Sequence, residues 1–566
     1  MKRIKFLRVA WAGVVAVILV RLFVVQILQH TMWEKTAEKQ HVMQNEILAE
    51  RGKIFMMDDG SPVPVVMNSA VWTIALDPQV VNEEKVVALL ETHCKDYLVK
   101  NWRDAFKNKK SRYFLVANNV PFQSAEKVKS AKLSGVWLKN STKRVYPEGE
   151  MASGLLGFVN ADGVGQYGVE GANNKLLAGE NGLLRTVKDV NNVPLTIGND
   201  RVRVPAKNGQ DIYLSLDRNI QTAVEKILNE SAQKHSASSA SAIVMRPHTG
   251  EVLAMANVPT YNPADYGKVK DASAYINRIT ESPYEPASVA KAFAMASAIE
   301  EGVMTPETTY NNQGMVTIDG WPIKNAYNGM LGTITMQDAL NYSLNTGSIE
   351  SLRLLGGGDL NTTGRKKLYD YYVNKFGLGR ETGIEVFESL GLISSPTEGD
   401  GRNSLYANMT FGQNMNVTMI QMISGFSALI NGGEWVQPSI IAHNVKNVNA
   451  NVNSPLSTSS QSTDYQPTKR RVISEKTSKT MRNMLFVTRR GSRMRGEDRE
   501  GYFVGGKTGT AQVIRDGKYT LDETVATYIG FGGKITEGDR KPTTLEAERA
   551  VTACPILSAN SGERLG

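Results

Sequence analysis

One long apolar run stands out in the pattern of hydrophobic and polar positions. Residues 9–28 are apolar except for Arg21 and Gln26, and at about 1.5 Å per residue a helix of this length spans roughly 30 Å, the thickness of a bilayer core. The eight residues before it hold four basic and no acidic side chains. Because basic flanks stay inside the cell, the pattern predicts a cytoplasmic tail at 1–8, a transmembrane anchor at 9–29, and the remainder of the chain outside the cytoplasmic membrane.

A cleaved signal peptide is the alternative interpretation of this run. Signal peptides usually have about 7–15 apolar residues and a small-residue cleavage motif, whereas this run is longer and is followed by Gln29-His30-Thr31. We therefore expect an uncleaved, single-pass anchor.

The pattern after the anchor predicts a region without catalytic residues. Residues 33–50 are amphipathic and lack Gly and Pro, which favours a helical stalk. A strand-like stretch at 70–76 is followed by helix-like stretches at 83–107 and 122–131. No nucleophile or ligand cluster stands out in this region. We interpret 30–208 as a stalk and a non-catalytic, mixed α/β pedestal domain.

A second domain is predicted from 209 to 566. It begins with a strand-like stretch at 211–216, and two apolar runs within 242–255 enclose a Pro- and Gly-containing turn that predicts a hairpin. Residues 446–467 are rich in Asn, Ser, Thr and Gln, which indicates a polar surface insertion. From residue 534 to 566 the chain is polar and turn-rich. The predicted fold class is α+β.

Composition narrows the possible chemistry. The 566 residues suffice for several domains, and 41% hydrophobic residues describe a globular protein with one anchor rather than a polytopic membrane protein. Two cysteines and six histidines without metal-ligand spacing argue against a metal site. The net charge of +9 comes with basic and acidic residues interleaved through most of the chain, so we expect no nucleic-acid partner.

Ser-x-x-Lys is one arrangement that activates a serine without histidine, because residues i and i+3 share a helix face. The chain has three matches: Ser124/Lys127, Ser231/Lys234 and Ser288/Lys291. Only the third follows a proline and has apolar residues around its lysine. Burial there would lower the pKa of Lys291, as a general base requires. An N-capping serine followed by a solvated lysine is the alternative that this motif alone leaves open.

Two further motifs follow in order along the chain. Ser343-Leu344-Asn345 lies 55 residues after Ser288, and the only Lys-Thr-Gly of the chain, Lys507-Thr508-Gly509, is followed by Thr510. Ser-x-Asn alone is a weak signal. The three motifs together form the set that is associated with penicillin-binding proteins and serine β-lactamases.

Here the chain resembles the class B penicillin-binding proteins, and among them the division-specific, septal peptidoglycan D,D-transpeptidases. Residues 284–291, YEPASVAK, resemble the family's Y-E-P-G-S-x-x-K, and residues 244–256 resemble its hairpin. The patterns at 157–159 and 168–182 are similar to the non-catalytic pedestal. The resemblance implies a membrane-anchored pedestal followed by a transpeptidase domain, whose antiparallel sheet is flanked by helices.

The resemblance also implies roles for the motif residues. Ser288 would attack the penultimate D-alanine of a stem peptide, and Lys291 would take its proton. Ser343 would pass a proton to the leaving group, and Asn345 would orient the peptide and Lys291. Lys507 would hold the terminal carboxylate with Thr508 and Thr510, and the glycine of the Lys-Thr-Gly motif, Gly509, lets the ligand approach the strand closely. Backbone N–H groups of Ser288 and Thr510 would form the oxyanion hole, and no metal, nucleotide or other cofactor is required.

By the same resemblance, the expected partners are peptidoglycan stem peptides, β-lactams as inhibitors, a polytopic septal glycan polymerase and other division proteins. Two alternatives stay open: a D,D-carboxypeptidase or β-lactamase-like hydrolase, and a catalytically silent scaffold.

The chain departs from the family pattern after Arg51-Gly52-Lys53-Ile54, where Phe55-Met56 replaces the usual Asp-Arg pair, and also before the nucleophile and in the tail. Ala287 replaces a glycine before the nucleophile, a small change that we expect to be tolerated at a helix start. In the tail only 550–553 resembles a strand, where the family has a further apolar strand and a helix. We therefore expect the sheet to be left with an uncovered edge, which makes the activity uncertain.

Overall fold

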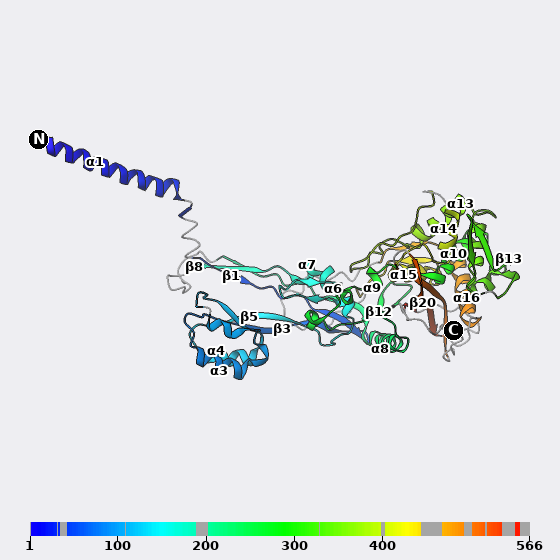
Figure 1. Ribbon diagram of the computed structural model, residues 1–566, viewed down its shortest axis with the longest axis horizontal. Coiled ribbons are helices and arrows are strands. Elements are labelled where there is room, and N and C mark those ends of the chain that lie inside the picture. The colour runs from blue at the N-terminus through cyan, green and yellow to red at the C-terminus, as the bar shows by residue number, and fades with distance from the viewer. Residues whose placement is uncertain are drawn as a thin grey trace. The chain divides into compact units, whose positions relative to one another are not determined.

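The computed structural model describes residues 2–30, 32–33, 42–107, 109–187, 202–327, 329–397, 402–442, 467–491, 501–515, 518–534 and 549–554 (Figure 1). The predicted insertion at 446–467, apart from residue 467, and most of the predicted tail lie outside these residues. The chain divides into two compact units. One comprises residues 1–52 and 175–210, and the other comprises residues 53–174 and 211–566.

The first unit contains the apolar helix and a small sheet. Helix α1 (Lys2–Phe23) continues into a π-helical turn, η1 (Val24–Leu28). The segment Ala10–Leu28 has a mean hydropathy of 2.4 and is long enough to cross a membrane, so the predicted apolar anchor helix is confirmed as a helix. Strands β1 (Val42–Ile47), β8 (Gly182–Val187) and β9 (Val202–Val204) form an antiparallel sheet.

The helical stalk predicted for residues 33–50 is wrong at β1. Val42 pairs with Val187 and Ile47 with Gly182, so the hydrogen-bond partners of this segment lie about 140 positions along the chain. Its amphipathic pattern was compatible with either structure. The partner strand decided the outcome, because strand formation depends on cross-strand neighbours more than on intrinsic preference.

The second unit begins with the pedestal sheet, which is organised by the 16-residue strand β3 (Ser61–Leu76). Its first part pairs with β2 (Ile54–Asp58), and its second part lies between β4 (Phe114–Pro121) and β5 (Val136–Val145). Strand β10 (Ile212–Asp217) adds to β2 in parallel, while Ser215 N–H donates to the Ile440 carbonyl at 2.7 Å. One strand thus connects the pedestal sheet to the carboxyl-terminal part.

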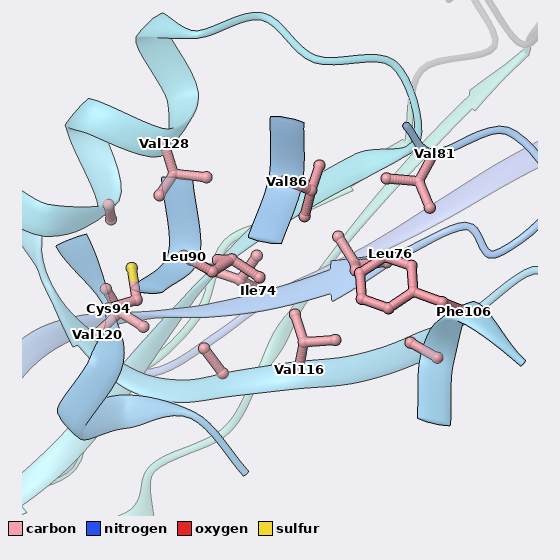
Figure 2. Packing of buried hydrophobic residues seen from close by; sticks show 13 residues of the cluster. Ile74, Leu76, Val81, Val86, Leu90, Cys94, Phe106, Val116, Val120 and Val128 are labelled. Atoms are coloured by element: carbon pink, nitrogen blue, oxygen red, sulfur yellow. The ribbon is translucent and has the colours of Figure 1, made fainter. Parts of the chain in front are cut away.

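We call residues 67–145 the head. Helices α3 (Glu83–His93) and α4 (Phe122–Ser130) cover one face of β3 and β4 there. Figure 2 shows Leu90 and Val128 of the helices packed on Ile74 and Val116 of the strands. The predicted strand at 70–76 and helix at 122–131 are confirmed. The helix predicted at 83–107 ends at His93, and two short 3₁₀ turns follow it.

The central sheet of the carboxyl-terminal part has the order β12 (Val252–Val258), β11 (Ala240–Met245), β21 (Arg549–Cys554), β20 (Lys518–Lys534), β19 (Tyr502–Arg515), and neighbours are antiparallel. The hairpin predicted within 242–255 is confirmed. Helix α8 (Arg218–Lys234) packs Leu228 and Ala232 on one face of β11 and β12.

The expected uncovered edge of this sheet is wrong. Val551 of β21 is paired with Val244 of β11 on one side and with Gly530 of β20 on the other. The short strand-like stretch of the tail is therefore a central strand, with ladder partners on both sides. The polar residues around this stretch gave no sign of a central position, because that position depends on pairing with two strands that are distant in sequence.

Two buried helices belong to the carboxyl-terminal part, and the second of them contacts the central sheet. Helix α10 (Ala290–Glu300) is buried from Ala290 to Ala298, and helix α15 (Met419–Ile430) is buried at every position. The Phe426 ring of α15 lies 6.3 Å from the Phe531 ring of β20, centroid to centroid. Because α10 follows Ser288 directly, this packing fixes the backbone on which the first motif stands.

Candidate active site

Ser288 lies in a tight turn at the start of a buried helix. The 3₁₀ turn η6 (Ala287–Val289) leads directly into α10, and the Ser288 side chain is half-buried. The Ala287 N–H donates to the Gly412 carbonyl at 3.1 Å, which ties the turn to the loop after α14 (Arg402–Met409). In the described part of the chain the Ser288 hydroxyl has no hydrogen-bond partner, so it is available to a ligand.

Lys291 lies one turn further along α10 and is fully buried. Its Nζ is 2.6 Å from the Ser343 carbonyl oxygen, 2.8 Å from Asn345 Oδ1 and 3.2 Å from Ser343 Oγ. Asn345 opens helix α12 (Asn345–Leu355), and Ser343 precedes it with a left-handed φ of 53°. That conformation presents the carbonyl and the hydroxyl of one residue to the same amine, and such strain is typical of functional sites.

Lys507 approaches the same hydroxyl from the sheet. It lies on β19, is 3% exposed, and donates from Nζ to Ser343 Oγ at 2.8 Å and to the Thr508 carbonyl at 3.0 Å. A Cβ on Gly509 would lie 2.9 Å from the Pro286 carbonyl and 3.2 Å from the Ser288 nitrogen. The strand therefore abuts the turn that carries Ser288, and only glycine allows so close an approach.

The structure brings all eight predicted site residues to one place. Ser288 and Lys291 come from η6 and α10, Ser343 and Asn345 from the start of α12, and the remaining four from β19. Thr508 is half-buried and Thr510 exposed, and they alternate along the strand with the buried Lys507 and Gly509. The Thr508 and Thr510 side chains thus leave β19 in the direction opposite to the Lys507 side chain.

Burial sets the electrostatics of the two amines. Desolvation lowers the pKa of Lys507 to about 7. Desolvation and then the charge of Lys507 lower the pKa of Lys291 well below its usual value. A neutral Lys291 amine has two N–H groups, which its contacts to the Ser343 carbonyl and to Asn345 Oδ1 can use, and its lone pair is left to accept a proton. This is the state that a general base needs.

These pKa shifts predict how acylation by a penicillin depends on pH. The second-order rate should rise as Lys291 loses its proton and should fall above about pH 7 as Lys507 loses the charge that could hold a carboxylate. Fluorescent-penicillin labelling from pH 5 to 9 measures this profile. An analogue without the carboxylate should keep the rising limb and lose the falling one, whereas a falling limb that persists with the analogue would contradict the role of Lys507.

Stability responds to pH through the same group. The folded-state pKa of Lys507 is lower than its unfolded value, so the unfolded chain binds more protons between about pH 7 and 10. The free energy of unfolding should therefore rise with pH in this window because of Lys507. A Lys507→Met variant should lose part of that slope.

A cavity of about 640 Å³ lies beside Asn345. Asn345 Nδ2 donates to the Lys324 carbonyl at 2.8 Å, so this side chain joins Lys291 to the cavity wall. Trp321 and Lys324 of strand β15 (Trp321–Lys324) form one wall, and Gln413 and Asn414 contribute to another. Trp321 is 69% exposed.

The sequence motifs did not point to the hairpin that carries Trp321 and Lys324. Strand β14 (Met315–Ile318) connects to β15 through Asp319-Gly320, and both turn residues have positive φ values, 50° and 81°. Asp-Gly between alternating apolar residues is a strong hairpin signal, and it was the one feature that pointed to these strands. In the described residues, no group of three or more His, Cys, Asp or Glu side chains is placed to hold a metal ion.

Comparison with known families assigns both parts of the chain. The model of the penicillin-binding protein transpeptidase domain matches residues 240–536, more than half of the chain, and the model of the penicillin-binding protein dimerisation domain matches residues 46–214. The chain belongs to the penicillin-binding protein transpeptidase family. Because it has both domains, it is a class B penicillin-binding protein.

Relatives and solved structures agree with this family. Stage V sporulation protein D of Bacillus subtilis is 32% identical over 421 residues, which cover 72% of this chain and 60% of the relative. The probable peptidoglycan D,D-transpeptidase PenA of Neisseria gonorrhoeae is 27% identical over 535 residues, 94% of this chain and 85% of the relative. Penicillin Binding Protein 2X from Streptococcus thermophilus has the same fold, with a TM-score of 0.69 at 22% identity, over 92% of this chain and 78% of that one.

Ala287, where the penicillin-binding protein pattern has glycine, adopts a left-handed conformation. Its φ is 54° and its side chain is buried. Gly412 packs against it so closely that a Cβ there would lie 2.2 Å from the Ala287 carbonyl oxygen. The expected helix-start position is therefore a strained one, since a left-handed residue with a Cβ costs about 1–2 kcal/mol.

We expect Ala287→Gly to raise the free energy of unfolding by about 1 kcal/mol, because glycine adopts this conformation without the Cβ penalty but has a more flexible unfolded state. Denaturant unfolding of the purified protein measures the change. Penicillin acylation should stay within about twofold. A destabilised variant would mean that the Ala287 methyl group contributes more by packing than it costs by strain.

Proposed function

We propose that this protein is a peptidoglycan D,D-transpeptidase that cross-links stem peptides through a serine acyl-enzyme during septal wall synthesis. The observation that carries the proposal is the convergence of Lys291 and Lys507 on Ser343 Oγ, next to the turn that holds Ser288. Relatives named peptidoglycan D,D-transpeptidase FtsI and PenA support the reaction. FtsI of Buchnera aphidicola is 26% identical over 492 residues.

In the first half-reaction the neutral Lys291 amine takes the Ser288 proton, and Ser288 Oγ attacks the carbonyl carbon of the penultimate D-alanine. The Ser288 and Thr510 backbone N–H groups stabilise the oxyanion, and loss of one such donor costs about 3–4 kcal/mol of transition-state stabilisation. The C–N bond then breaks, and Ser343 passes the proton from Lys291 to the departing D-alanine amine. Its hydroxyl lies between the two lysines.

The substrate is held along β19. The protonated Lys507 attracts the terminal carboxylate electrostatically, and the hydroxyls of Thr508 and Thr510 donate to it. In the second half-reaction the amine of a neighbouring stem attacks the ester carbonyl and Lys291 accepts its proton. The C–O bond to Ser288 then breaks, and Lys291 returns that proton to the departing Ser288 oxygen. The cavity lined by Trp321 and Lys324 extends from Asn345, where a peptide longer than two residues has room.

Two other functions were open from the sequence. A D,D-carboxypeptidase or β-lactamase-like hydrolase would use the same groups with water as acceptor. The hypothesis of a catalytically silent scaffold was based on the atypical tail, which was expected to leave a sheet edge unpaired. Strand β21 pairs with a neighbour on each side, so this reason no longer applies. The relatives' names favour the transpeptidase.

The cellular setting is also part of the proposal. The apolar helix is suited to a membrane anchor, and we place residues 1–8 inside the cell, 9–29 in the cytoplasmic membrane, 30–208 as stalk and pedestal, and 209–566 as the catalytic domain outside. A polytopic septal glycan polymerase and other division proteins are the proposed partners. β-lactams are the proposed inhibitors, since penicillin binding protein 3 from Mycobacterium tuberculosis, 23% identical, was solved with aztreonam.

The test uses the purified full chain and a stem peptide that ends in D-Ala-D-Ala, with and without a second peptide that bears a free side-chain amine. Mass spectrometry should detect released D-alanine and the cross-linked dimer, and prior treatment with penicillin should suppress both. Released D-alanine with only the shortened peptide would favour a carboxypeptidase. A folded protein that takes no fluorescent penicillin would favour the scaffold.

A further inference from the structure

The positive charge of the protein is concentrated in the head. Residues 95–143 contain twelve Lys or Arg and three Asp or Glu, a net charge of +9, which equals the net charge of the whole chain. All twelve basic side chains are exposed. Basic and acidic residues interleave through most of the chain but not in this segment, and the remainder of the chain has no net charge.

One end of the head, which we call the tip, combines these cations with exposed apolar side chains. The tip comprises residues 77–81, 109–113 and 132–137, which meet where β3 ends and β4 and β5 begin. The Asp77 N–H donates to the Gly135 carbonyl at 2.7 Å, and Lys109 Nζ donates to the Pro78 carbonyl at 2.7 Å. These contacts hold the three loops together as one surface.

Three large side chains of the tip face solvent. Val80 is 52% exposed, Tyr113 56% and Trp137 44%, and the Tyr113 and Trp137 rings stack with centroids 5.9 Å apart. Lys109, Lys110, Arg112 and Lys132 are exposed in the same loops. The single acid of the tip, Asp77, is buried and paired with Arg112 at 3.5 Å, so the exposed charge there is entirely positive.

The tip lies far from the catalytic domain within its unit. Strand β3 starts beside Asp58, which pairs with Arg218 of α8 at 3.2 Å. Its sixteen residues then extend about 50 Å at roughly 3.3 Å each before the tip. Sequence signals for such a surface are weak, because Val80, Tyr113 and Trp137 become neighbours only through the sheet register.

We propose that the tip is a second membrane contact, which inserts Val80, Tyr113 and Trp137 at the interface of an anionic phospholipid bilayer. Tyr and Trp prefer the lipid–water boundary, aliphatic side chains gain by leaving water, and lysines attract anionic head groups. An acidic protein or a wall polymer would use the charge but would gain less from exposed Val80. The inference is independent of the proposed catalysis and rests only on the proposed membrane attachment.

Hydrogen exchange on the full chain tests the proposal. The protein is placed in nanodiscs of phosphatidylcholine alone, or with about one third phosphatidylglycerol. Amide exchange in 77–81 and 109–113 should slow at least fivefold only with the anionic lipid. Lys110→Glu/Lys132→Glu should abolish the difference. The matched control Lys127→Glu/Lys143→Glu, which changes two exposed head lysines outside the tip, should retain it.

Each remaining outcome overturns the proposal. Equal amide exchange in both lipids would show that the anionic surface does not contact the tip. If both double variants lost the slowed exchange equally, the effect would come from the net charge of the protein alone. The same protection in detergent with dissolved teichoic acid or polyglutamate, and none in nanodiscs, would assign the tip to a wall polymer or an acidic protein. Fluorescent-penicillin labelling should be unchanged in all variants, which separates this result from any failure of the catalytic proposal.

Discussion

Ser288→Ala will abolish covalent labelling by fluorescent penicillin and all formation of cross-linked peptide. The acyl-enzyme ester needs an oxygen nucleophile at this position, and no neighbouring group can replace it in the turn η6. The hydroxyl is small and half-buried, so the change should shift the free energy of unfolding by less than about 1 kcal/mol. Labelling followed on a gel, with unfolding measured in parallel, gives both values.

The chain supplies matched controls for this experiment. Ser124 and Ser231 also precede a lysine by three positions, but they lie in α4 and α8, away from the three-motif site. Ser124→Ala and Ser231→Ala should label at the rate of the unmodified protein. Label that survives in Ser288→Ala, or disappears in Ser231→Ala, would place the nucleophile elsewhere.

Lys291→Met will lower the acylation rate by at least about a thousandfold, within the range for loss of a positioned general base. Methionine fills a similar volume but accepts no proton. The Ser288 hydroxyl would then have to lose its proton to water in a site where Lys291 is fully buried. Single-turnover labelling kinetics measure the loss, and Lys234→Met, in the second Ser-x-x-Lys pair, is the matched control.

The same variant should not lose stability. Burial and the charge of Lys507 disfavour a proton on Lys291, so folding at pH 7 is opposed by the proton that this lysine must release. Methionine removes that cost, while two hydrogen bonds to Ser343 and Asn345 are lost. We expect the free energy of unfolding to stay the same or rise by on the order of 1 kcal/mol. A strongly destabilised Lys291→Met would mean that the lysine is mainly structural.

Local signals in the sequence predicted much of this molecule. The apolar run of α1, the hairpin of β11 and β12, and the strand and helices of the head each depend on patterns within about twenty residues. The three motifs predicted the eight residues from Ser288 to Thr510 that the structure brings together, because residue type and order carry the chemistry expected of them. The burial of Lys291 was also predictable, because its neighbours in α10 are apolar.

Other features depended on contacts between distant residues. β1 is a strand because β8 pairs with it, and β21 is a central strand because β11 and β20 both pair with it. The wall at Trp321 and the charged tip of the head also arise from register between strands.

The sequence by itself determined which groups we propose to act, because residue types and their order predict a nucleophile, a base and a carboxylate-binding cation. Only the tertiary structure decided that Lys291 and Lys507 share the Ser343 hydroxyl at 3.2 and 2.8 Å and that Ala287 and Ser343 take left-handed conformations. Those distances join residues up to 164 positions apart. Packing of α10, α12 and β19 sets them, and no local pattern encodes that packing.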